Sequence, residues 1–305
     1  MNKDCTIVIP TYYPGQVILN LLKTIPKEFK VIILDNANDA YLSDVLKSCG
    51  LTIQHLKLGD IGLGKSFNKA LSIINTELIF LTQPDVILQK NCIENLIKTF
   101  RIYSSAAIIA PLIYDGNEYS QYDYYDLKIS KFKKLLNTKK SKFIKKNKPS
   151  GDISVEAVNS TALLLDVKKI KEIGGWDDNF YTYLEDIDLC LRLRQSGYEI
   201  IKSPNAHVVH AGFSSHKNEN RQKMNISRNW NFTWSSLYFY KKHKNKLSFI
   251  VYFNKIFFKY LFKILINIIL NRKYKLKIYQ IRFGACLDFF NEKKYLDSKY
   301  KKNIH

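Results

Sequence analysis

Short apolar runs alternate with longer amphipathic segments through the first third of the chain. Five runs rich in β-branched residues are predicted as buried strands, at residues 5–9, 30–34, 52–58, 77–82 and 106–110. Four intervening segments have the apolar spacing of helices, at residues 16–24, 40–49, 66–75 and 90–102. The alternation predicts an α/β fold with a mostly parallel sheet covered by helices on both faces. Ligands of such sheets bind beyond the carboxyl ends of the strands, where this chain has Thr11, Asp35-Asn36 and Gln83–Asp85.

The pattern resumes after a lysine-rich interruption. Residues 127–151 contain ten lysines and no acid, which predicts an exposed, solvated loop. The elements expected beyond it are a strand at 155–165, helices at 166–172 and 183–196, and strands near 198–202 and 206–210. The predicted organisation is a domain at 1–230, made of parts 1–115, 116–150 and 151–230, followed by a separate C-terminal region at 231–305.

The apolar segment 247–270 is long enough to suggest a transmembrane helix. Lys255, Lys259 and Lys263 recur in it every four residues and therefore share one helical stripe. Since a lysine at mid-bilayer costs about 2.5–3.5 kcal/mol, three of them argue against a span. The segment is predicted to be an amphipathic helix that lies on a lipid surface, or alternatively one that packs on the main domain.

Charge is distributed unevenly along the chain. The total of 48 Lys+Arg against 27 Asp+Glu gives a net charge of +21. Residues 1–115 have 11 basic and 10 acidic side chains, residues 116–230 have 20 and 14, and residues 231–305 have 17 and 3. The excess of +14 in the last part indicates an anionic partner surface at that end, either lipid headgroups or nucleic acid.

The cysteines and the N-terminus both indicate a cytoplasmic protein. Five cysteines are scattered without a CxxC pair, which favours reduced thiols over a disulfide framework or a zinc site. The first residues, MNKDCTIVIPTYYPG, lack the apolar core and cleavage site of a secretory signal.

The stretch Gly59–Ser66, GDIGLGKS, satisfies the GxxxxGK[ST] pattern of a phosphate-binding P-loop. Backbone N–H groups and Lys65 could bind the phosphates of any nucleotide there. A P-loop NTPase normally has this loop after its first strand, whereas two strand–helix units precede it here. A P-loop NTPase therefore stays an alternative function, and a basic nucleic-acid-binding protein is a second one.

Carboxylates are concentrated in the block GGWDDNFYTYLEDIDLCLR, residues 174–192. Glu185, Asp186 and Asp188 open a predicted helix, where one or two of them could serve as N-terminal caps. Capping does not account for the glycines and aromatic residues before them. A carboxylate at this position that stays ionised can act as a base.

Taken in order, these motifs resemble glycosyltransferase family 2. The motifs that carry the resemblance are Pro10-Thr11-Tyr12, Asp35-Asn36, the Gly62…Asn68 turn, Gln83-Pro84-Asp85 and the GGWDD…EDIDLCLR block. The resemblance covers residues 5–215 and is strongest to a rhamnosyltransferase-like branch that builds bacterial surface polysaccharides. It implies a GT-A fold, with a nucleotide-binding half at 1–115 and an acceptor half at 151–230. It also implies transfer of a sugar from a nucleotide-diphosphate donor with inversion.

The resemblance also implies roles for individual residues. Those expected at the donor are Pro10, Thr11, Tyr12, Asp35, Asn36, Gly62, Gly64, Lys65, Gln83, Asp85 and Trp176. Asp85 matches the last acid of the family's DxD metal motif and His210 a family histidine, so these two are expected to bind Mg²⁺ or Mn²⁺. Gln83 replaces the first acid of that motif, which weakens the metal prediction. Asp186, supported by Glu185, is expected to be the base, with Glu185 as the alternative.

The expected partners follow from the family and the charge distribution. The donor would be dTDP-rhamnose or a UDP-sugar, and the acceptor a glycan or a polyprenyl-linked oligosaccharide of capsule, O-antigen or lipopolysaccharide synthesis. The basic C-terminal region is expected to hold the enzyme, as a peripheral protein, on the inner face of the cytoplasmic membrane. No nucleic-acid partner is expected, because the long apolar run at 247–270 suits lipid better.

Overall fold

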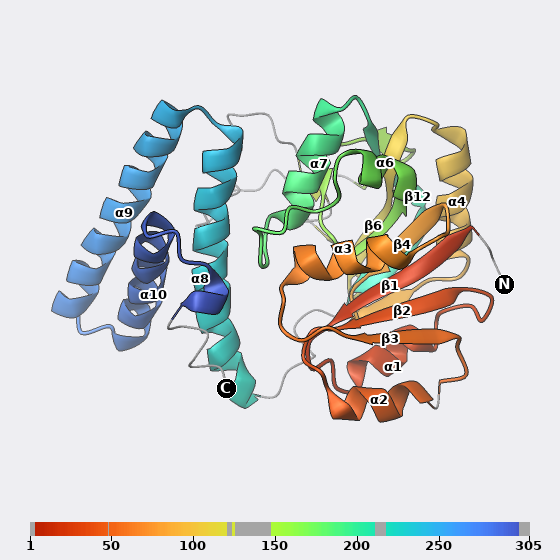
Figure 1. The fold of residues 1–305 in the computed structure, drawn as a ribbon, viewed down its shortest axis with the longest axis horizontal. Helices are drawn as coiled ribbons and strands as arrows, with labels where there is room; N and C mark the ends of the chain where they lie inside the picture. The colour runs from red at the N-terminus through yellow and green to blue at the C-terminus, as the bar shows by residue number, and fades with distance from the viewer. Residues whose placement is uncertain (1–3, 48, 121–123, 126–147, 211–217, 299–305) are drawn as a thin grey trace. The chain divides into compact units, whose positions relative to one another are not determined.

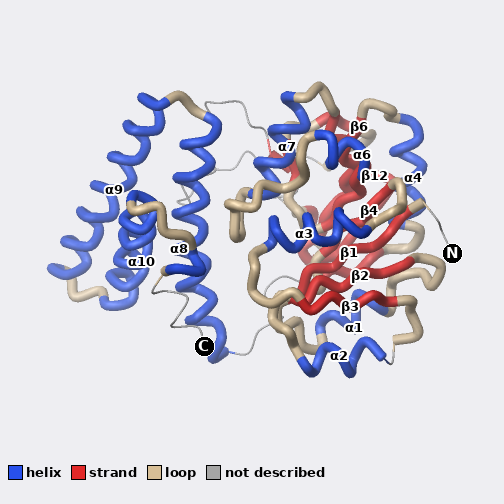
Figure 2. Tube along the Cα trace, viewed as in Figure 1, coloured by secondary structure: helices blue, strands red, loops and turns tan. Residues whose placement is uncertain are grey.

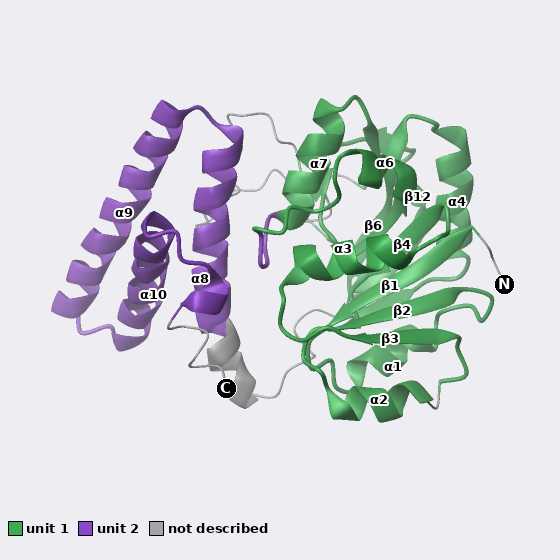
Figure 3. Cartoon of the chain, viewed as in Figure 1, with its two compact units in different colours: residues 1–179, 185–216 green, residues 180–184, 217–305 purple. Residues whose placement is uncertain are grey.

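The computed structural model describes residues 4–47, 49–120, 124–125, 148–210 and 218–298, and the side chains of α8 from residue 225 onward. The chain divides into two compact units, shown in Figure 3. Unit 1 comprises residues 1–179 and 185–216, and unit 2 comprises residues 180–184 and 217–305. The predicted lysine-rich loop falls almost entirely outside the described residues. The sequence placed the boundary of the C-terminal region at 230/231, whereas the units divide at 216/217.

A ten-stranded sheet forms the centre of unit 1, with the path β3-β2-β1-β4-β11-β6-β12-β5 (Figure 2). Its strands are β1 (Cys5–Thr11), β2 (Lys30–Asp35), β3 (Ile53–Lys57), β4 (Leu78–Thr82), β5 (Val86–Leu88), β6 (Ala106–Asp115), β7 (Glu118–Tyr119), β9 (Ile153–Ser154), β11 (Ala162–Asp166) and β12 (Glu199–His210). β8 (Tyr124–Tyr125) and β10 (Ala157–Val158) pair separately. β1, β2, β3, β4, β6 and β12 all run in one direction, while β11 and β5 run against them. The carboxyl ends of six strands thus meet at one edge.

Helices cover both faces of this sheet, as predicted (Figure 1). They are α1 (Val17–Leu22), α2 (Ala40–Lys47), α3 (Leu63–Ile73), α4 (Cys92–Ile102), α6 (Val167–Glu172) and α7 (Glu185–Gln195). α1, α2 and α4 share one hydrophobic core with alternate strand residues such as Ile7, Val31 and Phe80. α3 packs on β1 and β2 at the other face, where Val8 and Ile32 are buried.

Three predicted elements differ from the structure at backbone irregularities. The strand expected at 155–165 is split into β10 and β11 by the loop at 159–161. The strands expected at 198–202 and 206–210 form one strand, β12, with a bulge between Ser203 and His207. β6 continues through Pro111, because this proline pairs with Ser203 beside that bulge and its missing N–H is tolerated there.

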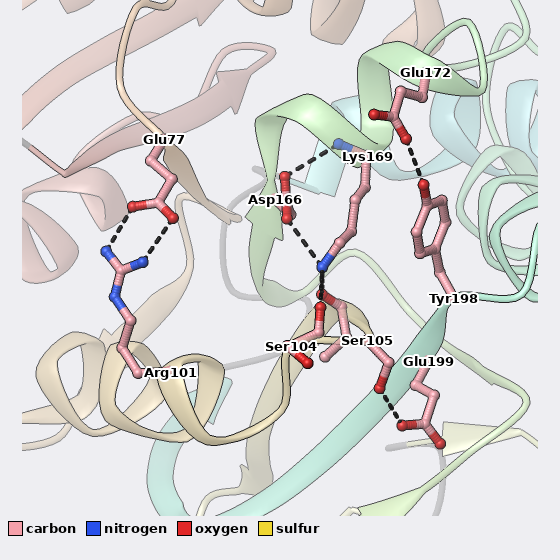
Figure 4. A network of polar contacts seen from close by, with 10 residues as sticks. Glu77, Arg101, Ser104, Ser105, Asp166, Lys169, Glu172, Tyr198 and Glu199 are labelled. Carbon is pink, nitrogen blue, oxygen red and sulfur yellow. Dashed lines mark hydrogen bonds and ion pairs between the residues drawn. The ribbon is translucent and has the colours of Figure 1, made fainter.

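A network of polar contacts lies at the amino-terminal edge of the sheet, opposite the edge where the six strands end (Figure 4). Arg101 on α4 donates twice to Glu77, with N–O distances of 2.6 and 2.5 Å. Lys169 on α6 donates to the Ser104 carbonyl oxygen at 2.6 Å and pairs with Asp166 at 3.1 Å. These contacts tie the amino ends of β4 and β6 to the helices and leave the carboxyl edge available for chemistry.

Unit 2 is a bundle of α8 (Asn218–His243), α9 (Lys246–Ile269) and α10 (Lys273–Phe290), followed by a 3₁₀ turn at Tyr295–Asp297. Its core is aromatic: Trp230 and Trp234 stack at 6.3 Å between ring centroids, and Phe289 lies 5.4 Å from Trp234. The buried face of α9 contributes Ile256 and Tyr260 to this core. The helix predicted at 247–270 therefore packs on neighbouring helices through one of its faces.

Candidate active site

A buried hydrogen-bond network joins the ends of β1 and β2 to the start of α3. The Asn36 amide donates to the Thr11 carbonyl oxygen at 3.0 Å, and the Asn36 side-chain oxygen bonds the hydroxyl of Ser66. That hydroxyl also lies 2.8 Å from the Gly62 carbonyl oxygen and is fully buried. A P-loop serine must face a bound magnesium ion. The burial of Ser66 disagrees with the P-loop interpretation.

Asp35, expected at the nucleoside, is directed inward and bonds groups of the chain itself. Its two carboxylate oxygens accept from the amides of Ala37 at 3.0 Å and Asp39 at 2.9 Å. His55 on β3 lies 3.1 Å from the same carboxylate, which is fully buried. The carboxylate shapes the turn after β2, because an aspartate at a strand end is well placed to accept from the amides that follow.

Two exposed groups lie at this part of the edge. Tyr12 is 38% exposed, and burial of its hydroxyl together with the charge of Asp60 raises the pKa of Tyr12 to about 12, so that it stays a neutral donor. Lys65 is exposed in the first turn of α3, which contains no acid. A cation at a helix N-terminus opposes the helix dipole unless an anion binds beside it. Gly62, at φ 88°, and the buried Gly64 let the backbone begin this helix without side-chain obstruction.

Glu185 and Asp186 form a buried acid pair at the start of α7. Glu185 is 3% exposed, and its Oε2 atom has no hydrogen-bond partner within the described part of the chain. Burial, reinforced by the neighbouring Asp186, raises the pKa of Glu185 to about 8. Asp186 accepts from the amides of Ser160 at 3.0 Å and Ile187 at 2.8 Å, and burial raises its pKa. Burial therefore favours the protonated form of Glu185, whereas the two amides that bond Asp186 favour its ionised form, which makes Asp186 the better proton acceptor of the pair.

The acid pair is connected to the loop after β4. Ser160, whose amide bonds Asp186, is followed by Thr161, the last residue before β11. The Thr161 carbonyl oxygen accepts from the Gln83 amide at 3.1 Å and from the Thr82 hydroxyl at 3.2 Å. A short chain of backbone bonds therefore joins the Asp186 carboxylate to the Gln83–Asp85 turn.

Asp85 lies against His210, the pair expected to bind a metal. His210 Nε2 is 3.4 Å from Asp85 Oδ2, and Nδ1 is 3.7 Å from Asp115 Oδ1. The hydrogen bond that His210 donates to Asp85 and the charges of both carboxylates raise the pKa of His210. His207 faces elsewhere, with its ring 5.9 Å from that of Tyr114.

Asp85 suits a divalent cation chemically, because carboxylate oxygen is an ordinary ligand of both Mn²⁺ and Mg²⁺, whereas the imidazole nitrogen of His210 suits a transition metal such as Mn²⁺ better than Mg²⁺. Among the residues that the structure describes, no group of three or more His, Cys, Asp or Glu could hold a metal ion. A cation at this place would therefore need further ligands from the donor diphosphate.

Trp176, expected at the donor, is buried in the core. It is 4% exposed, and its ring lies 5.1 Å from that of Phe67 on α3. Asn68 fixes the backbone at Trp176. Its side-chain NH₂ group donates to the Trp176 carbonyl oxygen at 2.8 Å and to Asp178 at 2.7 Å. Its side-chain oxygen accepts from the Trp176 amide at 2.9 Å. The tryptophan anchors the glycine turn to α3.

The third carboxylate in the first turn of α7 is structural. Asp188 is fully buried and pairs with Arg192 at 2.8 Å. Arg192 donates in turn to the carbonyl oxygens of Ile173 at 3.0 Å and Gly175 at 2.7 Å. Arg192 and Asn68 therefore fasten the glycine turn from two sides.

The sequence model described as Glycosyl transferase family 2 matches residues 6–165, more than half of the chain. The chain belongs to this family. It is 24% identical over 216 residues to the rhamnosyltransferase WbbL of Escherichia coli K12, covering 66% of this chain and 79% of WbbL. It is 23% identical over 216 residues to the pre-mycofactocin glycosyltransferase of Mycobacterium tuberculosis H37Rv, covering 68% of this chain and 43% of that protein.

Solved structures of similar fold are also glycosyltransferases. The mannosyltransferase PcManGT of Pyrobaculum calidifontis, in complex with GDP-Man and Mn²⁺, has a TM-score of 0.53 at 10% identity and covers 95% of this chain and 88% of that one. GalNAc-T7 with UDP, GalNAc and Mn²⁺ has a TM-score of 0.53 at 13% identity, over 75% of this chain and 51% of that one. The predicted GT-A fold is confirmed.

Sequence reasoning missed several residues of this candidate site. Asp115 is, like Asp35 and Asp85, a polar residue at the end of a strand, but the sequence predicted that this strand ends before Pro111. Asn68 was named only as the end of the Gly62…Asn68 turn, and its bonds to Trp176 and Asp178 were not foreseen. Ser160 contributes only its amide, for which the sequence contains no signal.

Proposed function

We propose that this family-2 glycosyltransferase transfers a hexose from dTDP-rhamnose or a UDP-sugar to a hydroxyl of a glycan or lipid-linked oligosaccharide, with inversion, in the synthesis of a bacterial surface polysaccharide. One observation carries the proposal. The Asp186 carboxylate is oriented by the Ser160 amide and is joined by backbone bonds to the Gln83–Asp85 turn at the carboxyl edge of the sheet. The proposed base and the proposed donor site are therefore held by the same stretch of hydrogen-bonded backbone.

In the proposed reaction, Asp186 removes the proton of the acceptor hydroxyl. The oxygen then attacks the anomeric carbon from the face opposite the leaving nucleotide diphosphate, which inverts the configuration. Burial favours the protonated form of Glu185, which limits the negative charge that the pair carries beside the acceptor. The Ser160 amide holds the accepting carboxylate in place throughout.

We assign donor binding to the exposed groups at the edge. The Tyr12 ring offers a surface for the base, and Lys65 with the start of α3 offsets the charge of the diphosphate. A divalent cation held by Asp85 and His210 would supply further stabilisation of the leaving diphosphate.

Thermal unfolding in the presence of nucleotides tests the donor site. At 100 times its Kd a nucleotide should stabilise the protein by about 2.7 kcal/mol. We expect UDP or dTDP to stabilise it more with Mn²⁺ than with EDTA, and Asp85→Asn to remove this metal-dependent part. Asp44→Asn, at an exposed carboxylate on α2, serves as the control and should leave it unchanged. Stabilisation by ATP alone would contradict the proposed function.

We further propose that unit 2 binds the inner surface of the cytoplasmic membrane through the exposed side of α9, named here the α9 apolar face. This face consists of Leu247, Ile250, Val251, Phe258, Leu261, Phe262, Leu265, Ile268 and Ile269, each at least 36% exposed. Lys255, Lys259 and Lys263 lie between this face and the buried one. Apolar side chains bordered by cations fit a bilayer with anionic headgroups. No helix among the described residues is long and apolar enough to cross a membrane.

Sedimentation with lipid vesicles tests this proposal. We expect the protein to bind phosphatidylglycerol vesicles, and to bind phosphatidylcholine vesicles more weakly. Phe258→Glu combined with Phe262→Glu should weaken binding more than about tenfold, because each phenylalanine contributes about 1.5–3 kcal/mol when buried. Ile102→Glu, at an equally exposed apolar position on α4, is the control. Equal effects of the two changes, or binding to DNA in place of vesicles, would contradict the proposal.

A further inference from the structure

The segment Phe180–Leu184 passes from unit 1 into unit 2 and back (Figure 3). It directly precedes the acid pair in the chain. Phe180 is fully buried, with its ring 4.9 Å from that of Tyr238 on α8, and the Tyr181 ring lies 4.6 Å from that of Tyr295. The first half of the segment is therefore built into the aromatic core of the helical unit.

The second half of the segment is also attached to α8. Ser235 donates its hydroxyl to the Thr182 carbonyl oxygen at 2.8 Å. The Tyr183 ring meets that of Phe232 edge to face, at 5.9 Å between centroids. Residues 180–183 thus all have a partner in the helical unit, although Glu185 belongs to unit 1.

Backbone strain is concentrated at the junction between this segment and α7. Tyr183 and Leu184 have φ angles of 68° and 67°, in the left-handed region that costs a side chain with Cβ about 1–2 kcal/mol per residue. Such strain persists only where the surroundings fix the backbone at both ends. Ser235 fixes it on one side through Thr182, and Ser160 fixes Asp186 on the other.

From this arrangement we infer that the helical unit positions the acid pair, acting through the segment 180–184, and that Ser235 is the positioning residue of this device. The inference rests on the proposed role of Asp186 as the base. It gives unit 2 a part in the chemical step that is separate from its proposed contact with lipid. A change in the position of α8 would move the segment 180–184, which Ser235 bonds, and this segment is joined directly to the start of α7 by the backbone.

The test compares two neighbouring serines in the full-length protein. Ser235→Ala removes the bond to Thr182, whereas Ser236→Ala removes a hydroxyl that bonds the Phe232 carbonyl oxygen within α8. We expect Ser235→Ala to lower kcat about tenfold, since small misplacements of reacting groups have effects of this size. KM for the donor should stay unchanged, and Ser235→Thr should restore kcat. An equal loss in Ser236→Ala, or an effect on donor KM alone, would overturn the inference.

Hydrogen exchange of the Ser160 amide provides a readout that needs no transferase activity. This amide is bonded to Asp186, so its exchange rate reports directly on the position of that carboxylate. We expect it to exchange several times faster in Ser235→Ala than in Ser236→Ala, with equal rates in α3. Unchanged exchange would overturn the inference. Faster exchange in a protein that transfers no sugar would retain the inference about position and refute the proposed function.

Discussion

Asp186→Asn is expected to lower kcat for sugar transfer about 10²–10⁴-fold, the contribution of a well-placed general base. Asparagine keeps the shape of the side chain and can still accept from the Ser160 amide, but it cannot take up a proton. Nucleotide binding should stay within about twofold of the original protein, because Asp186 is not assigned to the donor. The measurement is kcat and donor KM with the purified protein and a hydroxyl acceptor.

Glu185→Gln is the matched control for this change. Below pH 8 Glu185 is protonated, so glutamine resembles its resting state. We expect a loss of less than about tenfold and the disappearance of the pH dependence near pH 8, where Glu185 would acquire a second negative charge beside Asp186. If Glu185→Gln abolished transfer while Asp186→Asn retained it, the roles within the pair would be reversed.

Gly175→Ala is expected to reduce the free energy of unfolding by about 2–5 kcal/mol. Gly175 has a φ of 72°, which alone costs an alanine about 1–2 kcal/mol. A Cβ atom there would also lie 2.5 Å from the side-chain oxygen of Asn68 and 3.3 Å from Leu71. Overpacking of this kind costs about 1–3 kcal/mol more. Asn68 cannot retreat easily, because it bonds the backbone of Trp176 twice.

Gly174→Ala separates the cost of the left-handed backbone from the cost of overpacking. Gly174 has a φ of 80° but open space around its Cβ position, so we expect only the backbone cost of about 1–2 kcal/mol. Urea unfolding of both variants provides the comparison, and a matching difference in Tm of about 2–4 °C per kcal/mol is expected for a unit of this size. Equal destabilisation by the two alanines would show that the contact with Asn68 is relaxed in solution.

The periodicity of the sequence was sufficient to predict most of the fold. Continuous apolar runs such as 30–34 and 77–82 are buried on both faces, as expected for central parallel strands. The errors lie where a tertiary contact overrides a local signal. Pro111 stays inside β6 because the partner strand bulges beside it, and no property of residues 106–115 alone indicates that. The antiparallel direction of β11 is likewise a property of the whole sheet.

The candidate site could be predicted in outline from residue types. Asp85 and His210, far apart in the sequence, do lie together, and Asp186 joins the same edge. The resemblance to family 2 implied donor contacts for Asp35 and Trp176, yet both are buried beside partners that only the fold brings near, His55 and Phe67. The type of a residue shows which contacts its side chain can make, whereas the fold decides whether that side chain faces a ligand or the core.

The route of the chain through the segment 180–184 has a further consequence for the evolution and engineering of this enzyme. Because the helical unit is assembled from two separate stretches of sequence, it is not a module that can be exchanged at a single junction. A protein cut before α8 would leave Phe180, Tyr181 and Tyr183 without their aromatic partners, and such an uncovered patch favours aggregation. Any replacement of the C-terminal helices by those of a relative must bring a matching 180–184 segment with it.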